Sequence, residues 1–299
     1  MTAQSNHNFT SPLRYPGGKG ALSNFIKLVT AQNDLSDGDY VEVYAGGASI
    51  AWSLLFEEYV RRVHVNDLNA SLVAFWRCVL EDTEALCRLI LDTPVTMEEW
   101  YRQRDVQEMA RNHSILEVGF STFFLNRTNR SGIMKGGVIG GKGQAGPWKI
   151  DARFNKPDLI QRIQRIAGYA NRIFLYNLDA TDFIRDVLPT LSERTLVYLD
   201  PPYFQKGQEL YEDHYSEADH ATIANLVSAH LRHPWIVSYD ATPEIMSLYK
   251  DHRHILYSIS YSAQDRYAGS EVLFCSSSLL VPEVANPTTV RLPVFAASA

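Results

Sequence analysis

The sequence has few cysteines and no metal-binding pattern. Cys78, Cys87 and Cys275 are the three cysteines in 299 residues, and no two of them form a CxxC pair. The nine histidines form no HExxH motif and no other paired metal motif. Structural zinc sites and disulfide frameworks both need such spacings. We therefore expect free thiols in a reducing compartment and no metal.

Long apolar runs are also missing. No run approaches the roughly 20 apolar residues that a membrane-spanning helix needs, and residues 1–11 are polar, without the apolar core of a signal peptide. Hydrophobic residues make up 45% of the chain and charged residues 21%, which is ordinary for a globular protein. We expect a soluble cytoplasmic protein with no membrane partner, built as one large α/β domain with or without an insertion.

An overall excess of positive charge is absent as well. The net charge is -6, which by itself argues against nucleic acid as a partner, but residues 126–156 carry seven basic residues against one acid, Asp151. These basic residues are Arg127, Arg130, Lys135, Lys142, Lys149, Arg153 and Lys156. Two interpretations stay open: a patch that contacts phosphates, or a solvated surface loop.

The first chemical pattern that is present is the stretch Asp200-Pro201-Pro202-Tyr203. It follows the apolar run 196–199, which predicts a strand buried on both faces. The prolines end that strand, so the stretch lies at the carboxyl end of a central strand, where open α/β sheets bind ligands. A carboxylate, free carbonyls and an aromatic ring suit a planar base that bears an amino group. The alternative is a Pro-Pro turn with a capping Asp200 and a packed Tyr203.

A second pattern resembles half of a nucleotide-binding unit. Residues 40–44 predict a strand, residues 45–49 a turn of small residues that includes Gly46 and Gly47, and residues 50–60 a helix. Asp67 ends the next predicted strand, 20 residues after Gly47. An acid at that distance is placed to bind ribose hydroxyls. The alternative role for Asp67 is to cap the helix that begins near Asn69.

Two further segments complete the set of candidate site residues. Residues 12–20 are rich in glycine and hold Tyr15 and Lys19, but they lack P-loop spacing. A strand over 173–178 ends at Asp179 and Ala180, on the same edge of the predicted sheet as Asp67 and Asp200. Either a ligand contact or a helix cap explains Asp179.

Taken together, the motifs Tyr15-Pro-Gly-Gly-Lys19, the glycine turn with Asp67, and Asp200-Pro-Pro-Tyr203 resemble Dam-type DNA adenine methyltransferases over nearly the whole chain. The resemblance implies S-adenosylmethionine as cofactor and transfer of its methyl group to the N6 amine of adenine. The amine would meet Asp200 and the Pro201 carbonyl, with Pro202 shaping the turn and Tyr203 stacking on the base. The implied cofactor residues are Tyr15, Lys19, Tyr44, Gly46, Gly47, Asp67, Asp179, Ala180 and Asp200.

The resemblance also implies an architecture and partners. We expect a Rossmann-like, mostly parallel sheet with an antiparallel edge, formed by residues 1–68 and 157–299, and a helical target-recognition insertion at residues 69–156. Double-stranded DNA would be contacted by Arg127, Arg130, Lys135, Lys142 and Arg266. A bacterial or phage-encoded enzyme, a cognate restriction nuclease, and a monomer or weak dimer all fit this family.

Other activities stay open at this point. Related folds methylate adenine in RNA, and a relative that binds DNA without catalysis is a further alternative. Methylation of the cytosine amine is less favoured, because such enzymes more often begin the motif with serine. None of the three cysteines lies in the context of a nucleophile, which argues against methylation of cytosine carbon 5.

Overall fold

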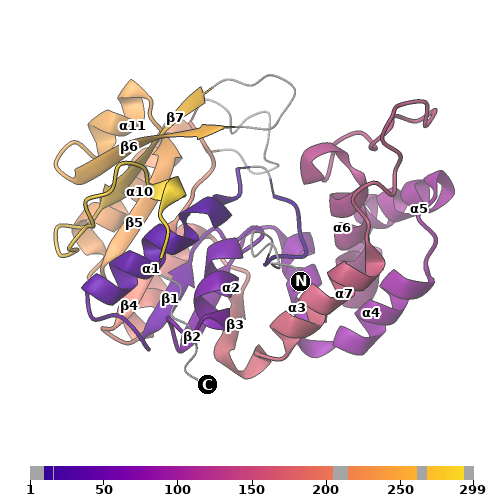
Figure 1. Ribbon diagram of the computed structural model, residues 1–299, viewed down its shortest axis with the longest axis horizontal. Coiled ribbons are helices and arrows are strands. Elements are labelled where there is room, and N and C mark those ends of the chain that lie inside the picture. The colour runs from indigo at the N-terminus through magenta and orange to yellow at the C-terminus, as the bar shows by residue number, and fades with distance from the viewer. Residues whose placement is uncertain (1–9, 16, 205–214, 261–267, 293–299) are drawn as a thin grey trace, which may run out of the picture.

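The computed structural model describes residues 10–15, 17–204, 215–260 and 268–292. Its centre is a seven-stranded sheet (Figure 1). The strands are β1 (Asp39–Glu42), β2 (Arg62–Asn66), β3 (Ile173–Tyr176), β4 (Thr195–Leu199), β5 (Trp235–Asp240), β6 (Arg253–Ser260) and β7 (Ala268–Cys275). The four strands predicted over 40–44, up to Asp67, over 173–178 and over 196–199 are present as β1, β2, β3 and β4, with ends that differ by a few residues.

The strand order decides where a ligand site can form. The order is β3-β2-β1-β4-β5-β7-β6; neighbours among β1 to β5 are parallel, and β7 is antiparallel to both β5 and β6. This confirms the expected mostly parallel sheet with an antiparallel edge. The chain crosses the sheet in one direction from β1 through β2 to β3, and β4 then pairs with the other side of β1. Glu42 of β1 lies opposite Tyr198 of β4. Such a reversal opens a crevice at the carboxyl ends of the two strands.

Ten described α-helices surround or extend this sheet. They are α1 (Ser23–Gln32), α2 (Ser49–Phe56), α3 (Ala70–Glu81), α4 (Thr83–Asp92), α5 (Met97–Glu108), α6 (Ile115–Thr128), α7 (Lys156–Ala167), α8 (Ala180–Asp182), α10 (Glu217–Asn225) and α11 (Pro243–Leu248). Side-chain caps begin α5 and α10: Thr96 accepts from the Glu99 amide, and Ser216 forms a capping box with Asp219.

Alternate residues of the central strands face two different parts of the core. Tyr40 and Leu196 pack into one hydrophobic cluster, whereas Val41 and Val197 pack into another on the opposite face. A strand covered on both faces needs apolar side chains in both directions, which explains the continuous apolar runs. The first cluster continues into the helical region through Phe75 and Phe123, so the helices share a core with one face of the sheet.

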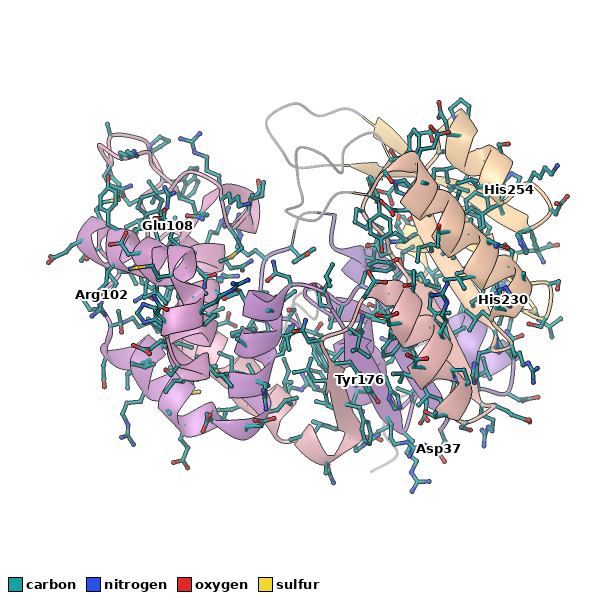
Figure 2. All side chains as sticks on the ribbon, turned by 180° about the vertical axis from the view of Figure 1, so that it is seen from behind. Asp37, Arg102, Glu108, Tyr176, His230 and His254 are labelled. Carbon is teal, nitrogen blue, oxygen red and sulfur yellow. The ribbon has the colours of Figure 1, made fainter. Side chains whose placement is uncertain are left out.

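Helices α3 to α7 lie together beside the sheet (Figure 1). Seen from behind, Arg102 and Glu108 of α5 lie at the opposite end of the molecule from His230 and His254 (Figure 2). The expected boundary at residue 157 assigns α7 to the catalytic part, yet α7 packs against α3 and α4. No helix among the described residues is long and apolar enough to cross a membrane.

A close approach between α3 and α6 generates the first prediction. A Cβ atom on Gly119 would lie 2.7 Å from Cys78 Sγ and 2.8 Å from the Ala74 carbonyl oxygen. The backbone of α3 cannot move aside as a flexible side chain can. Gly119→Ala is therefore expected to lower the free energy of unfolding by about 1–3 kcal/mol. The gain of about 1 kcal/mol in helix propensity opposes this only in part.

The measurement is urea denaturation of Gly119→Ala beside Gly143→Ala. A Cβ on Gly143 meets no atom within 4 Å, so this control should change stability by less than about 0.5 kcal/mol. Equal stability of the two variants would contradict the close packing of α3 on α6.

Candidate active site

The turn after β1 is held in a conformation that few residues tolerate. Gly46 and Ala48 both have φ of +49°, in the left-handed region. The Gly46 amide donates to Asp67 Oδ2 at 2.9 Å, and the Trp76 indole donates to the Gly46 carbonyl at 3.0 Å. The amide of Gly46 is therefore fixed by Asp67, which follows β2, and the carbonyl of Gly46 is fixed by Trp76 of α3.

Asp67 is fixed at the end of β2 without capping a helix. Its Oδ1 accepts from the Asn69 amide at 3.0 Å, and Asn69 itself caps α3 by accepting from Leu72 at 3.0 Å. The cap that the sequence allowed for Asp67 thus belongs to Asn69. Two backbone amides hold the Asp67 carboxylate in place, which preorganises it as an acceptor for hydroxyl groups.

Tyr15 covers the glycine turn. A Cβ atom on Gly46 would lie 2.9 Å from the Tyr15 ring, so the ring can lie on the turn only because residue 46 is glycine. The Tyr15 side chain remains 36% exposed. An aromatic face and a fixed turn therefore meet at the crevice between β1 and β4.

A pocket at this crevice brings together eight of the nine predicted cofactor residues: Tyr15, Lys19, Tyr44, Gly46, Gly47, Asp67, Ala180 and Asp200. The ninth, Asp179, caps α8, because its Oδ1 accepts from the Thr181 amide at 2.7 Å. Glu42, Leu68, Leu178, Pro202 and Tyr215 also line the pocket. The sequence did not single out Glu42, which is buried at the end of β1.

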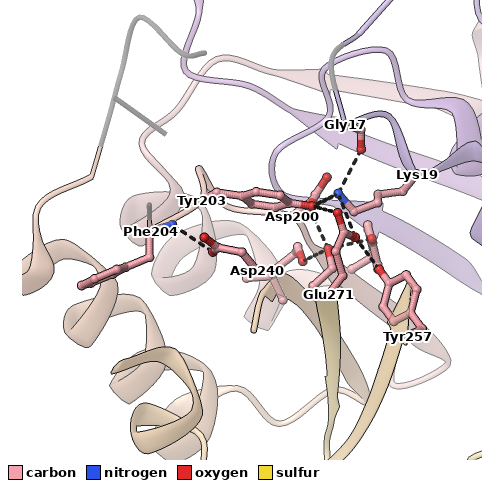
Figure 3. Close-up of polar contacts among 11 residues, drawn as sticks. Gly17, Lys19, Asp200, Tyr203, Phe204, Asp240, Tyr257 and Glu271 are labelled. Carbon is pink, nitrogen blue, oxygen red and sulfur yellow. Dashed lines mark hydrogen bonds and ion pairs between the residues drawn. The ribbon is translucent and has the colours of Figure 1, made fainter. Parts of the chain in front are cut away.

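Asp200 is positioned by two contacts to one oxygen (Figure 3). Lys19 Nζ lies 3.1 Å from Asp200 Oδ1, and the Ser238 hydroxyl donates to the same oxygen at 2.6 Å. The Asp200 side chain is 20% exposed. Burial raises the pKa of Asp200 above its ordinary value, and the charge of Lys19 and the bond from Ser238 oppose that rise.

Tyr203 is held by its hydroxyl group. Lys19 donates to the Tyr203 oxygen at 2.6 Å, and Tyr203 donates to Glu271 Oε1 at 2.5 Å (Figure 3). Lys19 Nζ also lies 4.8 Å from the centre of the ring. The residue is 5% exposed, so the aromatic face expected to be open for stacking is covered in this structure.

Glu271 of β7, which no sequence motif indicated, joins the network of Lys19 and Tyr203. Tyr257 donates to its Oε2 at 2.8 Å, and Lys19 Nζ lies 3.8 Å from the same oxygen. Glu271 is directly opposite Asp240 in the pairing of β7 with β5. One signal was visible in the sequence: an acid immediately before the apolar run 272–275.

The predicted DNA contacts lie in the helical part and the loop after it. Arg130, Lys135 and Lys142 are exposed. Arg127 is half-buried and donates to the Arg153 carbonyl at 2.7 Å. Burial and the nearby charges of Arg14 and Arg162 lower the pKa of Arg127. Arg266 lies outside the described residues.

Cysteine and metal chemistry find no support in the described residues. All three cysteines are buried free thiols, and burial raises the pKa of Cys78 and of Cys275 to about 12, which keeps these thiols protonated. In the part of the chain that the structure describes, no group of three His, Cys, Asp or Glu side chains could hold a metal ion.

Comparison with known families identifies the family of the chain. Residues 15–263 match the family of D12 class N6 adenine-specific DNA methyltransferases. The chain belongs to this family. It is therefore an adenine-specific DNA methyltransferase whose cofactor is S-adenosylmethionine. The pocket fits that cofactor, since it combines an aromatic ring, a close-approach glycine turn and an acid suited to ribose hydroxyls.

Two curated relatives are adenine or type II methyltransferases by name. Retron Ec67 DNA adenine methylase of Escherichia coli is 24% identical over 282 residues, which cover 89% of this chain and 91% of that protein. Type II methyltransferase M.MjaIII of Methanocaldococcus jannaschii is 24% identical over 205 residues, which cover 64% of this chain and 68% of that protein.

Among solved structures, a conserved hypothetical protein of Streptococcus pyogenes is 11% identical, with 80% of this chain and 86% of that chain covered and a TM-score of 0.32. That likeness is too low to support an argument about this methyltransferase. The strand order and the family match establish the fold of this methyltransferase.

The buried carboxyl of Glu42 generates a prediction about pH. Glu42 Oε1 accepts from the Ala51 amide at 2.8 Å, and burial raises the pKa of Glu42 from 4.5 to about 8. Between these two values the folded state keeps a proton that the unfolded state has lost. Folding therefore takes up a proton in this window, and the contribution of Glu42 to stability falls as pH rises through it.

Glu42→Gln removes this titration and keeps an acceptor for Ala51. The stability of the variant relative to wild type should be nearly constant below pH 4.5 and should rise by about 1.4 kcal/mol per pH unit up to pH 8. Urea denaturation at pH 5, 6, 7 and 8 measures this difference. A difference that does not change over this range would contradict a protonated Glu42.

Proposed function

We propose that this methyltransferase acts at a specific sequence in double-stranded DNA, on the N6 amine of an adenine rotated out of the duplex. The observation that carries the proposal is the position of Asp200. It lines the same pocket as Asp67 and Gly46, and both of its described contacts are made to Oδ1. Oδ2 is then the oxygen that accepts a hydrogen from the adenine amine.

The proposed cofactor contacts follow from the chemistry of the pocket. Asp67 accepts from the ribose hydroxyls, Tyr15 lies against the cofactor, and Gly46 and Gly47 allow its close approach. Tyr44, Lys19, Asp179 and Ala180 complete the proposed set; Asp179 would act only by shaping the turn that it caps. When bound, S-adenosylmethionine supplies an electrophilic methyl group on a positively charged sulfur.

The residues of the Asp200 elbow orient the amine. Asp200 Oδ2 and the Pro201 carbonyl each accept one amine hydrogen, which keeps the nitrogen lone pair from delocalising fully into the ring. Pro202 fixes the backbone at this point, and the hydroxyl of Tyr203 anchors its ring beside the elbow. Stacking of this ring on the base would require its covered face to be uncovered when DNA binds. As the adenine N6 forms its bond to the methyl carbon, Asp200 accepts one proton from N6. Most of the rate enhancement would come from this positioning.

DNA binding would use the helical part and its loop. A base inside the duplex cannot reach a recessed pocket, and rotating it out costs roughly a few kcal/mol. Exposed Arg130, Lys135 and Lys142 are the proposed phosphate contacts, and Arg127 supports the loop through Arg153. Arg266, outside the described residues, completes the proposed set. We place the recognition unit at residues 69–156 together with α7, because α7 packs on α3 and α4.

Replacing Asp200 tests the reaction directly. The wild-type protein should transfer labelled methyl groups from S-adenosylmethionine to PCR-amplified, unmethylated genomic DNA, with the label recovered as N6-methyladenine after digestion. Asp200→Asn should slow transfer by about 10²–10⁴-fold, because it removes the proton acceptor. The control Asp251→Asn changes an exposed aspartate and should transfer at the wild-type rate.

The failure of this assay is informative. A wild-type protein that binds the cofactor but labels no DNA would refute the DNA proposal, and label in structured RNA would then support an RNA adenine methyltransferase. A wild-type rate for Asp200→Asn would refute the assigned role of Asp200.

The proposed phosphate contacts predict a change in salt dependence. Arg130→Ala and Lys142→Ala should each weaken DNA binding and reduce the slope of log K against log salt concentration by about 1. Exposed Lys250, in the turn after α11, supplies the control, Lys250→Ala, which should leave the slope unchanged. Fluorescence anisotropy of a labelled duplex at 50 to 200 mM salt measures all three, and an unchanged slope for both loop variants would place the phosphates elsewhere.

A further inference from the structure

The buried cation of the active site lies between two carboxylates. Lys19 Nζ is 3.1 Å from Asp200 Oδ1 and 3.8 Å from Glu271 Oε2, and the Lys19 side chain is only 3% exposed. Asp200 belongs to the recognised motif. Glu271 lies on β7, beyond residues 15–263 that match the family. The family match thus includes only one of the two counter-ions.

Glu271 is buried more deeply than its partner. Its side chain is 1% exposed, against 20% for Asp200. A buried carboxylate is tolerated when it is paired and hydrogen-bonded, and Glu271 meets both conditions through Lys19, Tyr203 and Tyr257. Asp200 lines the pocket, so it is the carboxylate that substrate can reach.

The proposed reaction changes the charge of only one of these carboxylates. N6 forms a bond to the methyl carbon, the carbon–sulfur bond breaks with its electron pair remaining on sulfur, and one N6 proton passes to Asp200 and then to solvent. While Asp200 holds that proton, it no longer balances the charge of Lys19. A buried cation without a counter-ion is costly, and Lys19 would be driven out of position.

We propose that Glu271 is a positioning residue that keeps Lys19 and Tyr203 in place while Asp200 is neutralised during methyl transfer. Glu271 gains and loses no proton in this step. It acts through the Lys19 cation and through the Tyr203 hydroxyl, which donates to it at 2.5 Å. The inference rests on the proposed function, because it requires Asp200 to accept the amine proton.

The test replaces the charge and keeps the shape. With PCR-amplified, unmethylated DNA and S-adenosylmethionine, Glu271→Gln should lower kcat by about tenfold or more, as expected for loss of a hydrogen-bonded charge. KM for DNA and for cofactor should stay within about threefold, because ground-state binding does not use Glu271. Glu271→Asp keeps the charge and should recover part of kcat.

A second ion pair of a buried lysine provides the control. Buried Lys27 pairs at 2.6 Å with Glu57, whose side chain is 50% exposed and which lies outside the pocket. Glu57→Gln removes a carboxylate charge beside a buried lysine and should leave kcat within about twofold of wild type, as expected for substitutions away from the site. Thermal melts and cofactor binding show whether each variant is folded.

A double-variant cycle with Lys19→Gln tests the route of the effect. If Glu271 acts through Lys19, the double variant should transfer methyl groups about as slowly as Lys19→Gln alone. Full additivity would overturn the proposal, and so would a wild-type kcat for Glu271→Gln or a loss confined to KM. If Glu271→Gln does not fold, Glu271→Asp decides: a lowered kcat at unchanged KM supports the proposal, and wild-type kinetics overturn it.

The two proposals fail in distinguishable ways. Absence of methyl transfer to DNA by the wild-type protein refutes the proposed function. Normal transfer by the wild type together with normal transfer by Glu271→Gln refutes only the role of Glu271.

Discussion

The active site depends on one buried positive charge. Lys19, which is 3% exposed, contacts a loop carbonyl at Gly17, the carboxylate of Asp200 and the hydroxyl of Tyr203. These partners come from the N-terminal segment and from the end of β4, and Glu271 adds β7. A cation that binds several acceptors in a medium of low dielectric constant fixes them relative to one another. Lys19 thereby joins the segment proposed to meet the cofactor to the elbow proposed to meet the base.

Sheet topology brings these segments together. Because β1 and β4 are parallel neighbours, the glycine turn and the Asp200 elbow leave the sheet side by side. Asp67 then reaches the turn from β2 through a single hydrogen bond to Gly46. The glycine turn, Asp67 and Asp200 each follow directly from the end of a strand, and the segment with Tyr15 and Lys19 packs against them. Parallel pairing is therefore what converts three separated motifs into one pocket.

Local patterns predicted much of this organisation. The strands, Asp67 and Asp200 could be inferred because each depends on a short apolar run and the residues next to it, and Lys19 could be inferred from its glycine-rich motif. Glu271 could not, because its role depends on the antiparallel register that sets it opposite Asp240. Asp179 could either contact a ligand or cap a helix, and the local pattern does not decide between the two. The burial of the Tyr203 ring depends on neighbours that are distant in the sequence. Likewise, the packing of α7 on α3 and α4 follows from tertiary contacts that helical periodicity does not specify.

The hydrophobic cluster that runs from the sheet into α3 and α6 bears on how such enzymes diversify. Tyr40 and Leu196 of the sheet belong to the same cluster as Phe75 and Phe123 of the helices. A recognition unit with its own core could be exchanged between relatives as a whole, but the proposed recognition unit shares its core with the sheet. A transplant that ignored these buried residues would leave cavities or overlaps at the junction. If this unit reads the DNA sequence as proposed, its specificity is expected to evolve by substitution on the exposed loop after α6 rather than by exchange of whole domains.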